Sequence, residues 1–179
     1  MKVIYYLFKK YGSNFRLLVD SLEQPIYRHS DSKEQQKYFS GKKRQHTLKS
    51  QMIGMPEGKD IVEVEVGVPG PTADIKLFRQ SQQNFDKSQP FSGDKGFQGG
   101  ENIITPHKRK PKQELTQQQK DENKALSSNR IFIEHLIRLL KIFRIASQRF
   151  RLKLDTYEQI ILTVCGLVRL RISSLVLPN

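Results

Sequence analysis

The sequence predicts a mixed α/β domain. Residues Asp60 to Val68 alternate between apolar and polar side chains, which is typical of a half-buried strand. From Arg130 onward apolar residues recur at the spacing of an amphipathic helix. The expected order is three strands, a helix, two strands and then helices, which favours a sheet with helices packed on it.

The first half of the chain predicts three strands. Residues Phe15 to Ser21 form a short apolar run that ends on acidic and polar residues, as a buried strand does. Residues 46–55 and 60–68 flank a turn that contains Pro56 and Gly58, so we expect a β-hairpin. On its second strand we expect one face to carry Val62, Val64 and Val66 and the other to carry Ile61, Glu63 and Glu65.

The second half predicts short strands and then helices. After Pro69-Gly70-Pro71, either Thr72 or Asp74 can cap a short helix that runs to about Gln83. Residues 90–94 (PFSGD) and 101–106 (ENIITP) are two further short strands. A helix is expected from Leu115 to about Phe150, polar at first and amphipathic from Arg130. A last helix begins near Asp155, with a core face of Ile160, Ile161, Val164, Leu167 and Val168.

Composition narrows the class of protein. The 179 residues include 31 Lys and Arg against 18 Asp and Glu, a formal net charge of +13, and one cysteine, Cys165. A single cysteine excludes a disulfide framework and a cysteine-based zinc site. The apolar runs at residues 3–8 and 159–168 are too short for a signal-peptide core or a membrane span. We therefore expect a cytoplasmic protein with no membrane partner, whose positive charge favours nucleic acid as the partner.

Three acids lie at positions that suggest a cation site. Asp20 follows an apolar run and Asp94 follows Phe91, so both are expected at the ends of buried strands, where α/β sheets bind ligands. Glu134 lies beside the apolar stripe of the amphipathic helix. Each acid alone has an ordinary explanation: a turn, a loop, and an ion pair of Glu134 with Arg138. Together they describe a site for hard cations such as Mg²⁺.

Basic residues surround the third acid. Arg130, Glu134 and Lys141 project in nearly the same direction from a helix, and Arg138 and Arg144 flank them. This is either a solvated face of mixed charge or a carboxylate that binds metal between cations that bind DNA phosphates. The residues that we expect to contact DNA are Lys42, Lys43, Arg44, Lys108, Arg109, Lys110, Arg130, Arg138, Lys141 and Arg144.

Five ordered segments carry a resemblance to a known family. They are LLVDSLEQPIYR, YFSGKKRQHTLKSQMI, VGVPGPTADIKLF, SGDKGFQGG and NKALSSNRIFIEHLIRLLKIFRIASQRFR. The series, from about Phe15 to Val168, closely resembles the catalytic core of DDE-type insertion-sequence transposases, of the branch related to Harbinger-like elements. The resemblance implies a ribonuclease-H-like mixed sheet flanked by helices.

The resemblance also implies a metal site. The catalytic and metal-binding residues of the family correspond to Asp20, Asp94 and Glu134 of this sequence. These residues would bind a pair of Mg²⁺ ions, with Mn²⁺ as a substitute. Arg130, Glu134 and Lys141 match the spacing of a related signature, but Ser127 occupies its tyrosine position. Asp74 resembles another recurrent position, where histidine usually precedes the aspartate. We interpret Asp74 as a structural cap first, with a catalytic role as the alternative.

The expected organisation follows from the same resemblance. Residues 1–14 would be a remnant of a truncated region, 15–170 the catalytic domain and 171–179 a C-terminal tail. We expect no N-terminal helix-turn-helix module. The expected function is Mg-dependent phosphodiester hydrolysis and strand transfer at insertion-sequence ends; the alternative is a truncated, inactive DNA-binding remnant. Expected partners are double-stranded DNA, a second copy in a synaptic complex and a polypeptide from an upstream reading frame.

Overall fold

The computed structural model describes residues 15–109, 111 and 113–176 of the chain. The expected N-terminal remnant, residues 1–14, and the predicted DNA contact Lys110 therefore lie outside the described residues. Among the helices described, none is long and apolar enough to cross a membrane.

A six-stranded mixed sheet forms the centre of the molecule. Its strands run in the spatial order β4-β3-β1-β5-β6, and the short β2 pairs with β3. The pairs β1–β3 and β3–β4 are antiparallel, whereas β1–β5 and β5–β6 are parallel. The predicted α/β class is confirmed, and the sheet is consistent with the ribonuclease-H-like fold. The strands are β1 (Leu17–Pro25), β2 (Phe39–Ser40), β3 (Gln45–Gly54), β4 (Ile61–Pro69), β5 (Phe91–Ser92) and β6 (Ile103–Ile104).

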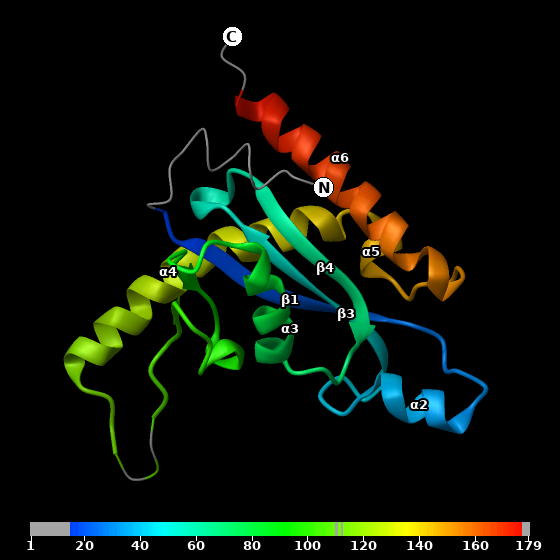
Figure 1. Ribbon diagram of the computed structural model, residues 1–179, viewed down its shortest axis with the longest axis horizontal. Helices are drawn as coiled ribbons and strands as arrows, with labels where there is room; N and C mark the ends of the chain where they lie inside the picture. Colours follow the sequence, from blue (N-terminus) through cyan, green and yellow to red (C-terminus); the bar gives the residue numbers. More distant parts are fainter. Residues whose placement is uncertain (1–14, 110, 112, 177–179) are drawn as a thin grey trace.

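Helices cover both faces of this sheet. Helix α3 packs on one face, and α4 and α6 pack on the other, with the short α5 between them in the chain (Figure 1). A capping box between Thr116 and Gln119 starts α4. The helices are α2 (Ser32–Tyr38), α3 (Asp74–Ser81), α4 (Gln117–Lys141), α5 (Arg144–Ser147) and α6 (Tyr157–Val176).

Alternation along the strands produces two apolar layers. On β1, Leu18 and Leu22 belong to the larger core with α4 and α6, whereas Leu17 and Val19 belong to the smaller core under α3. The smaller core is aromatic: Phe78 of α3 contacts both Phe91 and Phe97 edge to face. The layers therefore fix α3 and α4 on opposite sides of β1.

The predicted β-hairpin is present, but one residue faces the other way. Strands β3 and β4 pair around a short 3₁₀ turn, Pro56–Gly58, and the register shifts between Ile53 and Gly54. Because of this shift, Val62 packs in the α3 core while Val64 and Val66 pack against the α4 and α6 core. Ile61 joins the latter core, so the expected single face of valines is wrong at Val62 and Ile61.

The long helix ends earlier than its pattern predicts. Helix α4 stops at Lys141, Phe143 is extended, and α5 begins at Arg144, so Arg144 is not on the helix of Glu134. Buried Gln24 of β1 explains the break, because its Nε2 donates to the carbonyl oxygens of Ile145 and Gln148 at 2.7 and 2.8 Å. These bonds need α5 to turn back onto the sheet.

Helix α6 supplies much of the larger core. Ile161, Val164 and Val168 are buried as expected, but Leu167 is 46% exposed, so its place on the core face is wrong. Cys165 is buried, and burial raises the pKa of its thiol to about 12, which fits an unreactive core residue. The helix continues through Val176 and buries Ile172, so ordered structure extends past residue 170.

A bidentate ion pair holds α6 to the start of β4. Arg169 donates from Nε and Nη2 to the two carboxylate oxygens of Asp60, at 2.6 and 2.7 Å. We expect Arg169→Met to lower the free energy of unfolding by about 1 kcal/mol, since the pair is partly exposed. Denaturant unfolding of Arg169→Met, Asp60→Asn and the double variant measures the coupling. If the effects of the two substitutions are additive, the Arg169–Asp60 ion pair does not contribute to stability. The control is Arg171→Met, which changes an exposed arginine of the same helix.

Candidate active site

Asp20 lies inside β1 rather than at its end. The strand continues to Pro25, so the prediction of a strand-end position is wrong for this acid. What ends near Asp20 is the parallel pairing, whose last partners are Leu18 and Ser92. Asp20 comes two residues after Leu18 and Asp94 two residues after Ser92, so the two acids lie at the same level, just past the end of the parallel pairing.

Asp94 lies in a tight turn after β5. Its Oδ1 accepts a hydrogen bond of 2.7 Å from the Gly96 amide and caps the 3₁₀ turn Lys95–Phe97. Phe97 at the end of the turn is fully buried and fixes the turn to the aromatic core. The strand-end placement expected for Asp94 is therefore confirmed, with the acid two residues beyond Ser92.

Glu134 faces the same region from α4, and Arg130 joins it to Asp20. Arg130 Nη2 lies 3.2 Å from Glu134 Oε1 and 4.0 Å from Asp20 Oδ2. The ion pair that the sequence offered, Glu134 with Arg138, is wrong, because Arg138 donates to His135 Nδ1 at 2.8 Å. One guanidinium therefore serves two carboxylates that are far apart in the sequence.

The acids affect one another electrostatically. The pKa of Asp20 is raised to about 6, mainly because burial disfavours its charged form. The Ser21 amide and the Arg130 charge oppose this rise, and the negative charges of Asp94 and Glu134 add to it. Asp20 is thus a partly buried carboxylate with two like-charged neighbours.

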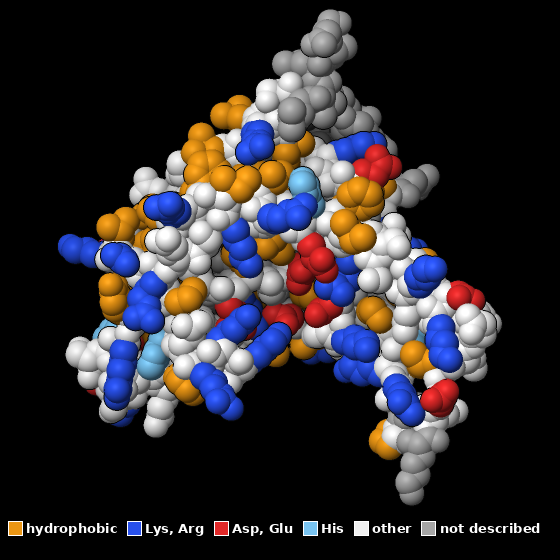
Figure 2. Space-filling view, turned by 180° about the vertical axis from the view of Figure 1, so that it is seen from behind, with side chains coloured by type: hydrophobic (Ala, Val, Ile, Leu, Met, Phe, Trp, Pro, Cys, Tyr) orange, Lys and Arg blue, Asp and Glu red, His pale blue; other side chains and the backbone are white. Residues whose placement is uncertain are grey.

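Acids and bases share a hollow beside α4. It measures about 410 Å³ and is lined by Asp20, Ser21, Glu134, Ile137, Arg138 and Lys141. Figure 2 shows, on the face seen from behind, acidic side chains in a recess bordered by Lys and Arg side chains. This arrangement suits a polyanion whose phosphates contact the border while one linkage reaches the acids.

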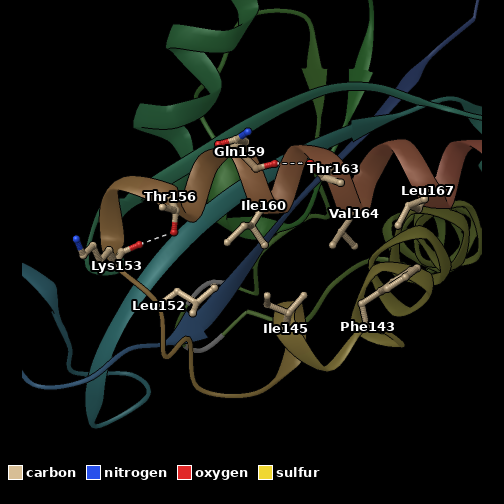
Figure 3. A pocket seen from close by; sticks show the side chains of 10 residues that line it. All are labelled: Phe143, Ile145, Leu152, Lys153, Thr156, Gln159, Ile160, Thr163, Val164 and Leu167. Carbon is tan, nitrogen blue, oxygen red and sulfur yellow. Dashed lines mark hydrogen bonds between the residues drawn. The ribbon is translucent and has the colours of Figure 1, made fainter.

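A larger hollow lies elsewhere and has a different character. It measures about 670 Å³, lies between α5 and α6, and is lined mainly by apolar side chains such as Phe143, Ile145, Leu152 and Leu167 (Figure 3). Its lining contains no acidic residue. This hollow is the larger of the two, but the carboxylates of Asp20 and Glu134 line the smaller one.

The carboxylates that line the smaller hollow are of the kind that binds divalent cations. Carboxylate oxygens are the ligands that Mg²⁺ and Mn²⁺ prefer, and the acids here have more negative charge than Arg130 alone neutralises. Within the described part of the chain, no three His, Cys, Asp or Glu side chains lie together as a ready metal site. Asp20, Asp94 and Glu134 are therefore neighbours that a cation would have to draw closer.

The other predicted DNA contacts lie at three places. Lys42, Lys43 and Arg44 are exposed in the turn between β2 and β3, where Arg44 has a positive φ of 51°. Lys108 and Arg109 are exposed in the loop before α4, and Arg109 lies 3.5 Å from Glu114. Arg138 and Lys141 line the acidic hollow itself, whereas Arg130 contacts two of its acids directly.

Asp74 is not the helix cap that the sequence predicted. The N-cap residue of α3 is Ala73, which makes no side-chain capping bond, so Thr72 and Asp74 are both wrong as caps. Asp74 instead lies 3.0 Å from Nζ of Lys49, a lysine that sequence reasoning missed. No sequence pattern marks Lys49, because the segment around it mixes polar and apolar residues; its burial in β3 is visible only in the structure. Ser127, at the signature tyrosine position, is exposed on α4.

The chain thus combines a mixed sheet that is consistent with the ribonuclease-H-like fold with three acids, Asp20, Asp94 and Glu134, whose charges act on one another beside it. The family model described as DDE superfamily endonuclease matches residues 19–169, and the chain belongs to this family. It is similar to the probable transposase for insertion sequence element IS702 of Microchaete diplosiphon, at 37% identity over 139 residues.

That similarity covers 75% of this chain and 49% of the relative, so the chain spans about half the length of the curated relative that it matches. No solved structure matches. The predicted resemblance to DDE-type insertion-sequence transposases is confirmed. The Harbinger-like branch, the absent helix-turn-helix module and the three-part division of the chain stay predictions.

Proposed function

We propose that this chain is the catalytic domain of an insertion-sequence transposase, which hydrolyses phosphodiester bonds at the element ends and transfers the freed strands. The observation that carries the proposal is the hollow that joins Asp20 and Glu134 to Arg138 and Lys141, with the charge of Asp94 acting on Asp20. Membership of the DDE superfamily supports the nuclease class. The presence of all three acids favours activity over an inactive remnant.

The acids would hold a pair of divalent cations, Mg²⁺ or Mn²⁺. Such ions, when bound, lower the pKa of water and stabilise charge on phosphoryl oxygens. Asp20, Asp94 and Glu134 would be their ligands. The pKa of Asp20 is raised to about 6, so this carboxyl loses its proton around that pH and cation binding should strengthen as the pH rises through this range.

The bases position the substrate. Arg138 and Lys141 line the hollow and would bind DNA phosphates on either side of the scissile bond. Arg130 lies between Asp20 and Glu134 and orients both carboxylates before cations bind. The partners that we propose are double-stranded DNA, a second copy of the chain at the paired ends, and a polypeptide from an upstream frame.

Strand cleavage tests this function. The chain is incubated with end-labelled DNA duplexes carrying the element ends, in Mg²⁺, in Mn²⁺ and in a chelator. We expect nicked product with either cation and none with the chelator. Equal product in the chelator, or none with either cation at protein concentrations that saturate the DNA, would contradict the proposed activity.

Duplex binding should depend steeply on salt. Each phosphate that a base neutralises adds about 0.9 to the slope of log affinity against log salt concentration. Exposed Lys42, Lys43 and Arg44, with Arg138 and Lys141, offer several such contacts. Fluorescence anisotropy between low and moderate salt measures the slope, and Lys141→Ala should lower it by about 1. A flat response would contradict a DNA-binding surface.

A further inference from the structure

Helix α3 is fixed to β3 by a polar contact at each end. At its last residue, Ser81 Oγ accepts a hydrogen bond of 3.0 Å from Gln51 Nε2. At its first residue, Asp74 Oδ1 lies 3.0 Å from Lys49 Nζ, which also donates to the carbonyl oxygen of Thr72. The two contacts come from the same strand and hold the same helix, but only the first residue of the helix lies near the candidate site.

Buried Lys49 and partly exposed Asp74 form an ion pair that holds the start of α3. Lys49 is 6% exposed, and a buried ammonium group needs an opposite charge to remain ionised. Asp74 provides that charge through Oδ1, which fixes the position of its carboxylate. The second oxygen, Oδ2, is left to face the turn that carries Asp94.

Gly96 shows how close the two aspartates are. A Cβ atom at Gly96 would lie 2.9 Å from Asp74 Oδ2 and 2.9 Å from Asp94 Oδ1. The two carboxylate oxygens therefore border the same small space and are separated by no more than twice that distance. The Gly96 amide donates to the same Oδ1 of Asp94, so this oxygen is held on the Asp74 side.

We propose that Asp74, fixed by Lys49, is a positioning residue for Asp94. The fixed negative charge of Asp74 disfavours orientations of Asp94 that would bring its second oxygen into the space beside Gly96. With Oδ1 bound to the Gly96 amide, the other oxygen of Asp94 is kept for the cation site. This inference rests on the proposed function, in which Asp94 is a cation ligand.

The test measures Mn²⁺ binding to the whole chain, by electron paramagnetic resonance of the free ion. Asp74→Asn removes a negative charge and Lys49→Met removes a positive one, so an effect of charge alone would change the Mn²⁺ affinity in opposite directions. Positioning predicts that both substitutions weaken binding, by about tenfold or more, as loss of a group that orients a metal ligand does. Lys49→Arg keeps the positive charge that pairs with Asp74 and should therefore bind Mn²⁺ more tightly than Lys49→Met does.

Ser81→Ala is the matched control. It removes the polar contact at the other end of α3 and should lower the melting temperature while leaving Mn²⁺ affinity unchanged. If Lys49→Met does not fold, as its circular dichroism will show, the pair Asp74→Asn and Ser81→Ala decides the question. Equal Mn²⁺ affinities of Asp74→Asn and Ser81→Ala, or opposite shifts for Asp74→Asn and Lys49→Met, would overturn the positioning role.

Asp94→Asn separates this inference from the function on which it rests. If Asp94→Asn loses Mn²⁺ binding and Asp74→Asn keeps it, the positioning role is wrong and the cation site stands. If Asp94→Asn binds Mn²⁺ like the natural chain, or the natural chain binds none, the cation site and the positioning role are both overturned.

Discussion

Glu134→Gln is expected to lower the rate of cation-dependent strand cleavage by more than about a hundredfold, because losing a metal ligand should exceed the loss seen when a supporting group is removed. Glutamine has nearly the same shape but no charge to hold a hard cation. Glu134 is exposed, so the packing of α4 should survive. DNA affinity should stay similar or rise slightly, since Arg130 is released from a contact of 3.2 Å and a negative charge is removed.

Two variants of the same helix complete this experiment. Lys141→Ala should weaken DNA binding and leave Mn²⁺ affinity unchanged, since Lys141 lines the hollow without providing an oxygen ligand. Asp121→Asn removes one exposed carboxylate near the start of α4 and should affect neither measurement. Cleavage rates and anisotropy titrations are compared for all three. Full cleavage by Glu134→Gln would show that Glu134 is not a ligand.

Asp20→Asn is expected to stabilise the cation-free chain above neutral pH, by about 2–3 kcal/mol in the free energy of unfolding. The pKa of Asp20 is raised from 3.8 to about 6, so the folded state binds this proton more tightly than the unfolded state does. Holding the ionised carboxylate in the folded chain is therefore costly. Asparagine avoids that cost and keeps an oxygen that can accept from the Ser21 amide.

The pH dependence identifies the cause. Below pH 3.8 Asp20 of the natural chain is protonated in both the folded and the unfolded state, and this group contributes its full stabilisation to the folded state. This stabilisation is lost as the pH rises through about 6, because the folded state binds the proton more tightly. The difference between Asp20→Asn and the natural chain should thus be small near pH 4 and largest above pH 7. Urea unfolding in a chelator at several pH values measures it, and a difference independent of pH would contradict the assignment.

Added Mn²⁺ should reverse the order of stability. A ligand that binds only the folded state stabilises it, so Mn²⁺ should raise the melting temperature of the natural chain and not that of Asp20→Asn. The natural chain would then become the more stable of the two. Equal effects of Mn²⁺ on both chains would show that Asp20 does not hold the cation.

Local pattern was enough to predict most elements. Alternation predicted the hairpin of β3 and β4, and helical spacing predicted α4 and α6, because each pattern reports which side of an element is apolar. It could not locate the end of α4 at Lys141, which depends on Gln24 of a distant strand. Nor did it reveal α2, a polar helix capped by Asp31 in a segment without an apolar stripe.

The candidate site, like the fold, was predictable from the sequence only in part. Asp20, Asp94 and Glu134 were proposed from the sequence, because each lies beside an apolar run and because they match the acids of the family that the sequence resembles; their role as cation ligands stays a proposal. Only the tertiary structure decided that Asp20 lies inside β1, that Arg130 rather than Arg138 contacts Glu134, and that Asp74 pairs with Lys49. The physical reason is that periodicity along the chain is a local property. Which charges meet depends instead on strand register and on the side from which each helix packs, and both are set by contacts between residues far apart in the sequence.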